Sequence, residues 1–351
     1  MTAQESGYRV DWVDYGKGIC IILVVMMHST YGYGAIAGGE GWMHHVVEFA
    51  KPIRMPDFFL IAGLFLSRSI HGPLADYIDK KVIHFAYFYV LWLAIQNVAL
   101  ESELLLADPL AFAVLFAKQL IFPSGSLWFL HQLLVFYVLT RLLRNVPAMV
   151  VLAAAALLQT LLYAGLIETG WSVTDRIANW YVFFFTGYAC APMLFRFASL
   201  AGRHKIFAIA GLAVWGLTNW GFVAAGLGEA PIVALALGMA GAGAIIAVAA
   251  ILAELNTGNV IRYAGQHSIV IYLTFFVPMK VGEKALGATG LIPDIGFACL
   301  TVLVIAVGVP LAIHALVRGT PLNFLYRRPA LFTLNRWQRG DGGKARIAPA
   351  E

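Results

Sequence analysis

Long apolar runs, each followed by a short polar or glycine-containing stretch, succeed one another along nearly the whole chain. A membrane-spanning helix needs about 20 mostly apolar residues, because each residue adds about 1.5 Å against roughly 30 Å of hydrocarbon. By that rule we expect an all-α integral membrane protein, one polytopic domain over residues 1–351 that forms a bundle of about ten transmembrane helices. The predicted spans are residues 17–33, 43–70, 82–100, 126–143, 147–167, 178–197, 206–227, 231–255, 266–281 and 291–317, with a tail at 318–351.

Residues 109–122 are also apolar, but they are too few to cross the bilayer comfortably. Pro123 and Gly125 follow directly and disfavour a continuous helix. We therefore predict a short re-entrant or interfacial helix between the third and fourth spans.

The N-terminal segment has features of a cleavable signal peptide, since Arg9 and Lys17 precede the apolar run 18–27 and small residues follow it at 35–37. Asp11 and Asp14 nevertheless lie in what would be the basic region, and His28 interrupts the end of the run. We expect this segment to be the first membrane helix.

Composition supports a surface that faces lipid. Hydrophobic residues make up 60% of the 351 positions, charged residues 12%, and the mean hydropathy is +0.78. A soluble domain is about 45–50% apolar and about 25% charged. The three cysteines, Cys20, Cys190 and Cys299, lie in apolar runs and suggest neither a disulfide framework nor a metal site.

The net charge of +5 does not indicate a nucleic-acid partner, because basic residues of membrane proteins gather in cytoplasmic loops. With ten spans and a cytoplasmic N-terminus, 18 of the 24 Lys and Arg residues fall on the cytoplasmic side. This bias predicts that both termini are cytoplasmic.

The first span carries three ionisable residues, Asp14, Lys17 and His28, and such groups are costly at membrane depth. At about 100° per residue they lie on one stripe of a helix, and His28 is about 16 Å of rise beyond Lys17. His28 suits a general base near the middle of the bilayer, and Lys17 at the cytoplasmic mouth suits the phosphates of an acyl donor. The alternative is a snorkelling lysine and a histidine that hydrogen-bonds within the bundle.

Other polar residues are weaker candidates. Lys80 and Lys81 in a predicted cytoplasmic loop suit donor phosphates, or they are ordinary loop cations. Asp57 either orients a sugar hydroxyl or the His28 ring, or pairs with Arg54. Arg54 itself either lines an acceptor site or is an ordinary interfacial cation.

Two residues of the predicted fourth span are candidates for acceptor binding. His131 either contacts an acceptor or hydrogen-bonds between helices, and Trp128 either stacks on a sugar or belongs to an interfacial aromatic belt.

Several short motifs resemble the membrane acyltransferase-3 family. The family signature is a basic residue followed by ten residues and then a His. Lys17 and His28 have this spacing, and Asp14 begins the motif. Further matches follow in the expected order, at 54–63 (Met-Pro into a Phe-rich run), 124–130 (Leu-Trp-Phe-Leu), 183–188 (Phe-rich into Gly-Tyr) and 268–273 (Ser to Ile-Tyr-Leu). Together they cover nearly the whole chain.

The resemblance implies about ten helices, a cytoplasmic acyl-CoA donor (acetyl-CoA above all, sometimes succinyl-CoA) and an exported or lipid-linked glycan as acceptor. Fucose O-acetylases and glucan succinyl transferases are the relatives it suggests. It also implies a multi-pass protein of the bacterial inner membrane, with acyl-CoA as co-substrate and no permanently bound cofactor.

Three positions depart from the family pattern. Ala62 stands where Ser is frequent, Asp57 where an apolar residue is usual, and Phe275 where a His often follows Ile-Tyr-Leu. A role for a second imidazole therefore cannot be carried over to this chain.

These observations predict a membrane-embedded O-acyltransferase that uses His28 as general base. The competing class is a secondary transporter or proton-coupled permease for a small polar substrate, since buried ionisable groups also line transport pathways. No internal repeat of the kind common in secondary transporters is visible. The mid-membrane His and the Lys on its stripe favour the enzyme.

Overall fold

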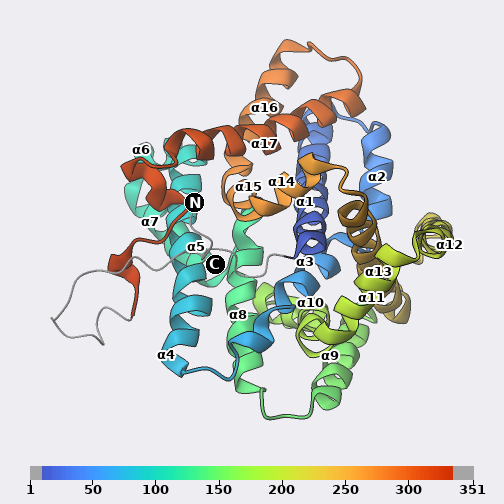
Figure 1. Ribbon diagram of the computed structural model, residues 1–351. Coiled ribbons are helices and arrows are strands. Elements are labelled where there is room, and N and C mark those ends of the chain that lie inside the picture. The colour runs from blue at the N-terminus through green and yellow to red at the C-terminus, as the bar shows by residue number, and fades with distance from the viewer. Residues whose placement is uncertain (1–9, 335–351) are drawn as a thin grey trace.

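The computed structural model describes residues 10–334, and in this range the chain is built from helices without a β-strand (Figure 1). Arg9 and the tail residues 335–351, for which a cytoplasmic position is predicted, lie outside the described range. The first half contains α1 (Asp11–Ala37), α2 (Trp42–Ala50), α3 (Arg54–Gly63), the 3-10 helix η1 (Leu66–Arg68), α4 (Leu74–Tyr77), the π-helix η2 (Ile78–Ile83), α5 (His84–Leu100), α6 (Ser102–Ala107), α7 (Pro109–Ile121), η3 (Gly125–Leu127), α8 (Trp128–Leu142) and α9 (Ala148–Tyr163). The second half contains α10 (Ser172–Ala189), α11 (Ala191–Arg203), α12 (Lys205–Ala224), α13 (Pro231–Leu255), α14 (Asn259–Gln266), α15 (Ser268–Thr274), α16 (Phe276–Thr289), α17 (Ile295–Val317), η4 (Pro321–Leu325) and η5 (Ala330–Phe332).

Within the described residues, six helical stretches are long and apolar enough to cross a membrane, and the bent pair α10 and α11 would make a seventh. The six are Asp11–Ala37, Leu74–Leu100, Pro109–Leu142, Lys205–Ala224, Pro231–Leu255 and Ile295–Val317. Helix α9 is apolar but shorter. The prediction of an all-α membrane protein is confirmed, whereas the predicted count of ten spans is not.

Three predicted spans are not single straight helices. Residues 43–70 form α2, α3 and η1, with Pro52 in the break between the first two. Residues 266–281 take in the end of α14, all of α15 and the start of α16. Helices α10 and α11 meet at 77°, next to Pro192 in the first turn of α11. Proline removes a backbone donor and clashes with the preceding turn. Pro52, Pro192 and Pro278, the last in the first turn of α16, therefore account for one break in each of these three segments.

The short helix predicted at 109–122 is present as α7. The Asp108 side chain accepts a hydrogen bond from the Ala111 N–H and so caps its first turn. Residues 122–124 separate it from η3 and α8. Its re-entrant or interfacial placement stays a prediction.

Helix α1 lies at the centre of the assembly, where α3, α13, α14, α16 and α17 all contact it (Figure 1). Glycines allow the closest approaches. A Cβ on Gly18 would collide with the Ile261 carbonyl of α14, and a Cβ on Gly265 would collide with the Asp14 carbonyl of α1. Small residues at helix contacts are typical of membrane bundles, because lipid supplies no hydrophobic force that drives helices together.

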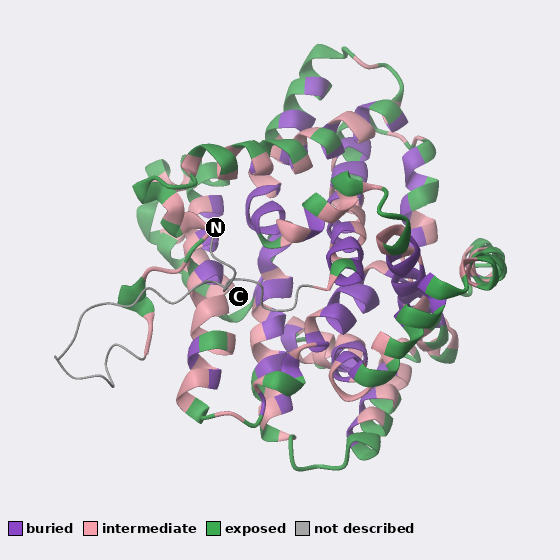
Figure 2. Cartoon of the chain, viewed as in Figure 1, coloured by how far each residue is buried: buried purple, intermediate pink, exposed green. Residues whose placement is uncertain are grey.

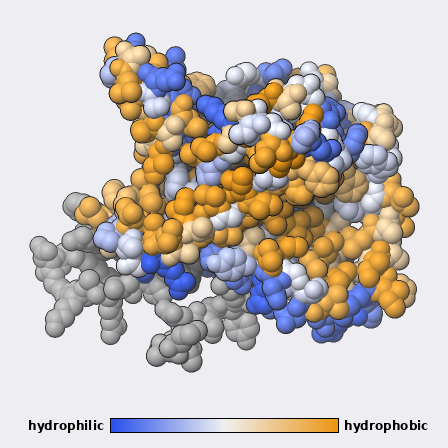
Figure 3. Space-filling model, turned by 90° about the horizontal axis from the view of Figure 1, so that it is seen from above, coloured by the Kyte–Doolittle hydropathy of each residue, from blue (hydrophilic) through white to orange (hydrophobic). Residues whose placement is uncertain are grey.

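The outer surface is largely apolar. Hydrophobic residues cover the middle of the face seen in Figure 3, and hydrophilic residues collect toward its upper and lower edges. Helix α12 stands at the edge of the molecule, and most of its residues are exposed (Figure 2). An apolar helix with so little protein contact requires lipid or another apolar partner around it.

We predict that Gly265→Ala destabilises the fold, because the added methyl group must push α14 away from the α1 backbone. Overpacking of this kind typically costs about 1–3 kcal/mol. The measurement is the thermal unfolding midpoint in detergent. Gly216→Ala on α12 is the matched control, since its Cβ would meet no atom within 4 Å, and it should leave the midpoint unchanged or raise it. Equal midpoints for the two variants would show that this close contact does not support the fold.

Candidate functional site around helix α1

The three ionisable residues predicted on one stripe do share helix α1, which begins at Asp11 rather than at the predicted residue 17. His28 lies in the C-terminal half of the helix and is half-buried. Its ring centroid is 5.5 Å from that of Phe275 and 6.1 Å from that of Phe276. No hydrogen bond reaches the ring nitrogens from within residues 10–334, so both remain open to a ligand.

Two cations from other helices act on the His28 ring, namely Arg54 at the start of α3 and Lys280 on α16. The Lys280 ammonium donates to Oε2 of Glu283 at 2.7 Å and lies over the Phe276 ring. His28 therefore lies among positive charge and aromatic surface. Such surroundings suit a substrate whose reacting oxygen becomes negative.

Glu283 is buried completely, and its Oε1 atom has no hydrogen-bond partner among the described residues. The carboxylate packs directly on Gly32, where a Cβ would collide with it. Gly32 follows His28 by four residues and so lies on the same face of α1. The Oε1 atom of Glu283, buried and without a hydrogen-bond partner in residues 10–334, and the His28 ring are thus neighbours along one helix face.

Arg54 connects this cluster to α2. Its neighbours include Tyr31 and Glu48, and the Tyr31 hydroxyl donates to the Glu48 carboxylate. The Nε and Nη1 atoms of Arg54 are buried and have no hydrogen-bond partner within residues 10–334. These two N–H groups could bind an anionic or carbonyl oxygen.

Asp57 is 1% exposed, and neither of its carboxylate oxygens has a hydrogen-bond partner in the described range. The described residues show no ion pair between Asp57 and Arg54. The carboxylate acts electrostatically on Cys20, which lies on α1 three residues after Lys17 and eight before His28. Asp57 therefore lies beside α1, closer to the level of Lys17 than to that of His28.

Trp128 and His131 form a separate group with Arg176. The Arg176 guanidinium lies 4.6 Å from the centroid of the Trp128 ring and acts electrostatically on His131. The His131 ring packs against the Tyr89 ring, and their centroids are 5.3 Å apart.

A chain of rings links this group to the His28 site. The Trp128 ring centroid lies 6.3 Å from that of Phe129, Phe129 lies 5.7 Å from Tyr272, and Tyr272 lies 6.4 Å from Phe275, whose ring packs against His28. Aromatic side chains therefore fill the space between the two groups.

At the other end of α1, Asp14 is buried and accepts a hydrogen bond from Gln266 on α14 at 3.3 Å. Lys17 is half-buried one turn further along. Asp11 pairs with Arg262 at 2.8 Å. Helix α14 thus fixes the polar end of α1 through two side-chain contacts.

Lys80 and Lys81 lie in η2, which Figure 1 shows apart from α1, between α4 and α5. Lys80 is exposed, whereas the Lys81 ammonium lies 5.4 Å from the centroid of the Tyr137 ring. The Arg141 guanidinium lies over Tyr77 at 5.0 Å, and its Nε and Nη1 atoms are buried without a partner in the described range. Tyr77 donates to the Tyr137 carbonyl, so Lys81 and Arg141 belong to one basic cluster.

The sequence analysis did not single out Lys280, Glu283 or Tyr31. A signal was present, because Lys280 and Glu283 are three residues apart in a mostly apolar segment, the spacing of an ion pair on one helix face. Among the described residues, no group of three or more His, Cys, Asp and Glu side chains could hold a metal ion.

Comparisons with known proteins bear on this arrangement. A family model described as "Acyltransferase domain" matches residues 10–314. The chain is 29% identical over 155 residues to the inner membrane protein YcfT of Escherichia coli (strain K12), in an alignment that covers 37% of this chain and 43% of YcfT. The chain thus spans less than half the length of this curated relative. No solved structure matches the chain.

The matched region contains α1 with its Lys17 and His28, and it extends to α16 with Lys280 and Glu283. The sequence motifs occur in the order that the family shows, and the family model matches residues 10–314, so both observations cover most of the chain. The protein belongs to the acyltransferase-3 family.

Proposed function

We propose that this protein is a membrane-embedded O-acyltransferase that moves an acyl group, acetyl above all, from cytoplasmic acyl-CoA to a hydroxyl of an exported or lipid-linked glycan. Family membership supports the reaction class. The observation that carries the proposal for the site is His28, whose ring nitrogens accept no hydrogen bond within residues 10–334 and which lies among Arg54, Lys280 and the unpaired Oε1 atom of Glu283. The inner membrane is proposed as its location, with both termini cytoplasmic, from the apolar helices, the charge bias and the likeness to YcfT.

In this mechanism His28 takes the proton of the acceptor hydroxyl as that oxygen attacks the thioester carbonyl. The carbon–sulfur bond breaks, an ester forms on the glycan, and the proton passes to the departing CoA thiolate. Arg54 and Lys280 stabilise the negative charge that develops on the carbonyl oxygen, as fixed cations in a site with little water do efficiently. Aromatic walls such as Phe275 exclude water, which would otherwise compete as acceptor.

Lys17 and Asp14 are assigned to the donor side. The pantetheine arm of CoA is an extended chain, so phosphates held near Lys17 leave the thioester free to reach His28 about 16 Å further along α1. Lys80, Lys81 and Arg141 offer further cations for the phosphates. On the acceptor side, Arg54 and Asp57 lie nearest α1, and Trp128 with His131 would contact a more distant part of the glycan.

The secondary transporter is the second class that the buried charges suggested. No observation in the described residues favours it over the enzyme, and the family match favours the enzyme.

We predict that His28→Gln lowers turnover by about 10² to 10⁴, because glutamine keeps hydrogen bonding but cannot carry the proton. The measurement is acyl transfer from acyl-CoA to glycan by purified protein in vesicles. His28→Gln should retain the thermal midpoint and the acyl-CoA affinity of the wild type. Turnover above about a tenth of normal would exclude His28 as the base.

Lys17→Ala should raise the KM for acyl-CoA about tenfold and leave the kcat at saturating donor nearly unchanged, because a lost phosphate contact weakens donor binding uniformly. Lys17→Arg should be close to wild type, since both side chains can bind a phosphate. The test is a set of initial rates against acyl-CoA concentration at fixed acceptor. An unchanged KM in the alanine variant would remove Lys17 from the donor site.

Glu283→Gln should raise the KM for the acceptor about tenfold, because a hydrogen bond to a charged group is worth about 1.5–3 kcal/mol. The KM for acyl-CoA should not change. Lys284→Gln, at an exposed position next to Glu283, is the matched control and should affect neither constant. A Glu283→Gln protein with wild-type acceptor KM but a lowered thermal midpoint would assign the carboxylate to stability alone.

A further inference from the structure

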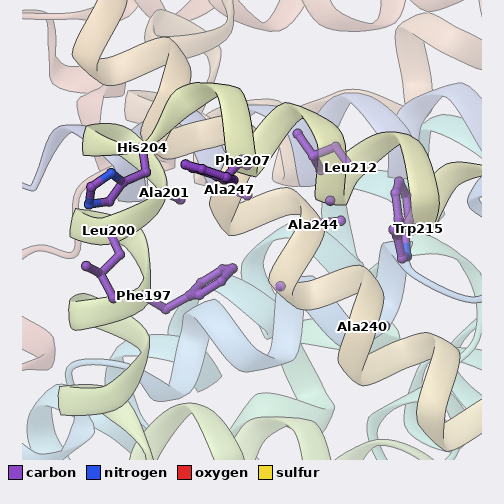
Figure 4. A pocket seen from close by; sticks show the side chains of 13 residues that line it. Phe197, Leu200, Ala201, His204, Phe207, Leu212, Trp215, Ala240, Ala244 and Ala247 are labelled. Atoms are coloured by element: carbon purple, nitrogen blue, oxygen red, sulfur yellow. The ribbon is translucent and has the colours of Figure 1, made fainter.

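A groove of about 710 Å³ lies between α11, α12 and α13, away from the His28 site (Figure 4). Its volume falls within the range of roughly 300–1,000 Å³ that is usual for small-molecule sites. His204 stands at one end of the groove and Trp215 at the other, with Phe197 and Phe207 between them (Figure 4). None of the residues assigned above to acyl transfer lines it.

Small residues create the space. Ala240, Gly243, Ala244 and Ala247 of α13 face Gly211 of α12 across the groove. A Cβ on Gly211 would meet no atom within 4 Å, so the opening is real at this point. Because the lining is almost entirely apolar, hydrocarbon fits it and water does not.

One end of the groove is basic. Arg203, His204 and Lys205 form the corner between α11 and α12, and Arg203 and His204 are exposed. Lys205 pairs with Glu254 at 3.9 Å. Arg203 makes no ion pair with any residue in 10–334, which leaves a net positive charge at this corner.

The length of the groove matches one leaflet. His204 and Trp215 are eleven residues apart, which corresponds to about 16 Å along a helix. Half of the hydrocarbon core of a bilayer is about 15 Å thick. An acyl chain that starts at the basic corner would therefore end near Trp215.

We propose that this groove is a binding site for an anionic phospholipid, with the headgroup phosphate at Arg203 and Lys205 and an acyl chain along α12 to Trp215. The charge at one end, the apolar lining and the length of one leaflet all favour this occupant. The lipid would fill the contact that α12 lacks with the rest of the protein and so hold α12 against α13.

The test uses the full-length protein in vesicles of phosphatidylcholine with increasing fractions of a phospholipid brominated on its acyl chain. The difference between wild type and Trp215→Phe isolates the fluorescence of Trp215, which bromine quenches on contact. Brominated phosphatidylglycerol should quench this signal at about a fivefold lower mole fraction than brominated phosphatidylcholine, the preference expected for about one net cation near an anionic headgroup.

Gly211→Leu should remove the quenching because it fills the groove, and Gly216→Leu, on the same helix outside the lining, should not. Arg203→Gln should make the two brominated lipids equally effective. Equal effectiveness of the two lipids on the wild type would overturn the proposal. A different result would assign the groove to a second copy of the chain instead. In that case neither lipid would quench Trp215, the wild-type protein would elute as a dimer, and Gly211→Leu would elute as a monomer.

Discussion

Close backbone contact along α1 is the constraint on which the rest of the structure depends. Lipid offers no hydrophobic drive for helix association, so packing and a few polar contacts must hold the bundle together. Glycines at several levels of α1 make this possible: Gly16 lies against Ile61 of α3, Gly18 against α14, and Gly32 against Glu283 of α16. The same contacts place the polar groups, because the helices that press on α1 carry Arg54, Asp57, Gln266, Lys280 and Glu283 to it.

Sequence reasoning located most helices because an apolar run of sufficient length is a direct consequence of bilayer thickness. It failed where a run was longer or more irregular than one crossing requires. Residues 43–70 exceed the roughly 20 residues of a single span, and Pro52 marks the break that the structure shows. Pro192 gave a similar signal for the bend between α10 and α11. Pro278, in the first turn of α16, marks the break between α15 and α16 in the same way.

The candidate site, too, could be predicted from the sequence only in part. Helical periodicity predicted that Asp14, Lys17 and His28 share one helix, because it depends only on residues close in sequence. The partners of His28 come from α3 and α16, which lie 26 and 252 residues further along the chain at Arg54 and Lys280, and no rule of helical spacing connects such separate segments. Phe275, at the position where relatives often have a histidine, does touch the His28 ring. The position at which relatives often have a histidine thus lies beside His28 in this chain, where it holds a phenylalanine ring.

Unpaired polar atoms in this neighbourhood tie the fold to the proposed reaction. A buried polar group without a partner costs about 1–3 kcal/mol, and native proteins contain few of them. Here Arg54, Asp57 and Glu283 each bury such atoms within the described residues, all on helices that contact α1. A glycan hydroxyl and a thioester carbonyl would supply the donors and acceptors that these atoms lack. Under the proposed function, substrate binding would restore the stability that these three unpaired side chains cost the protein, as expected of a site preorganised for polar substrates inside a membrane.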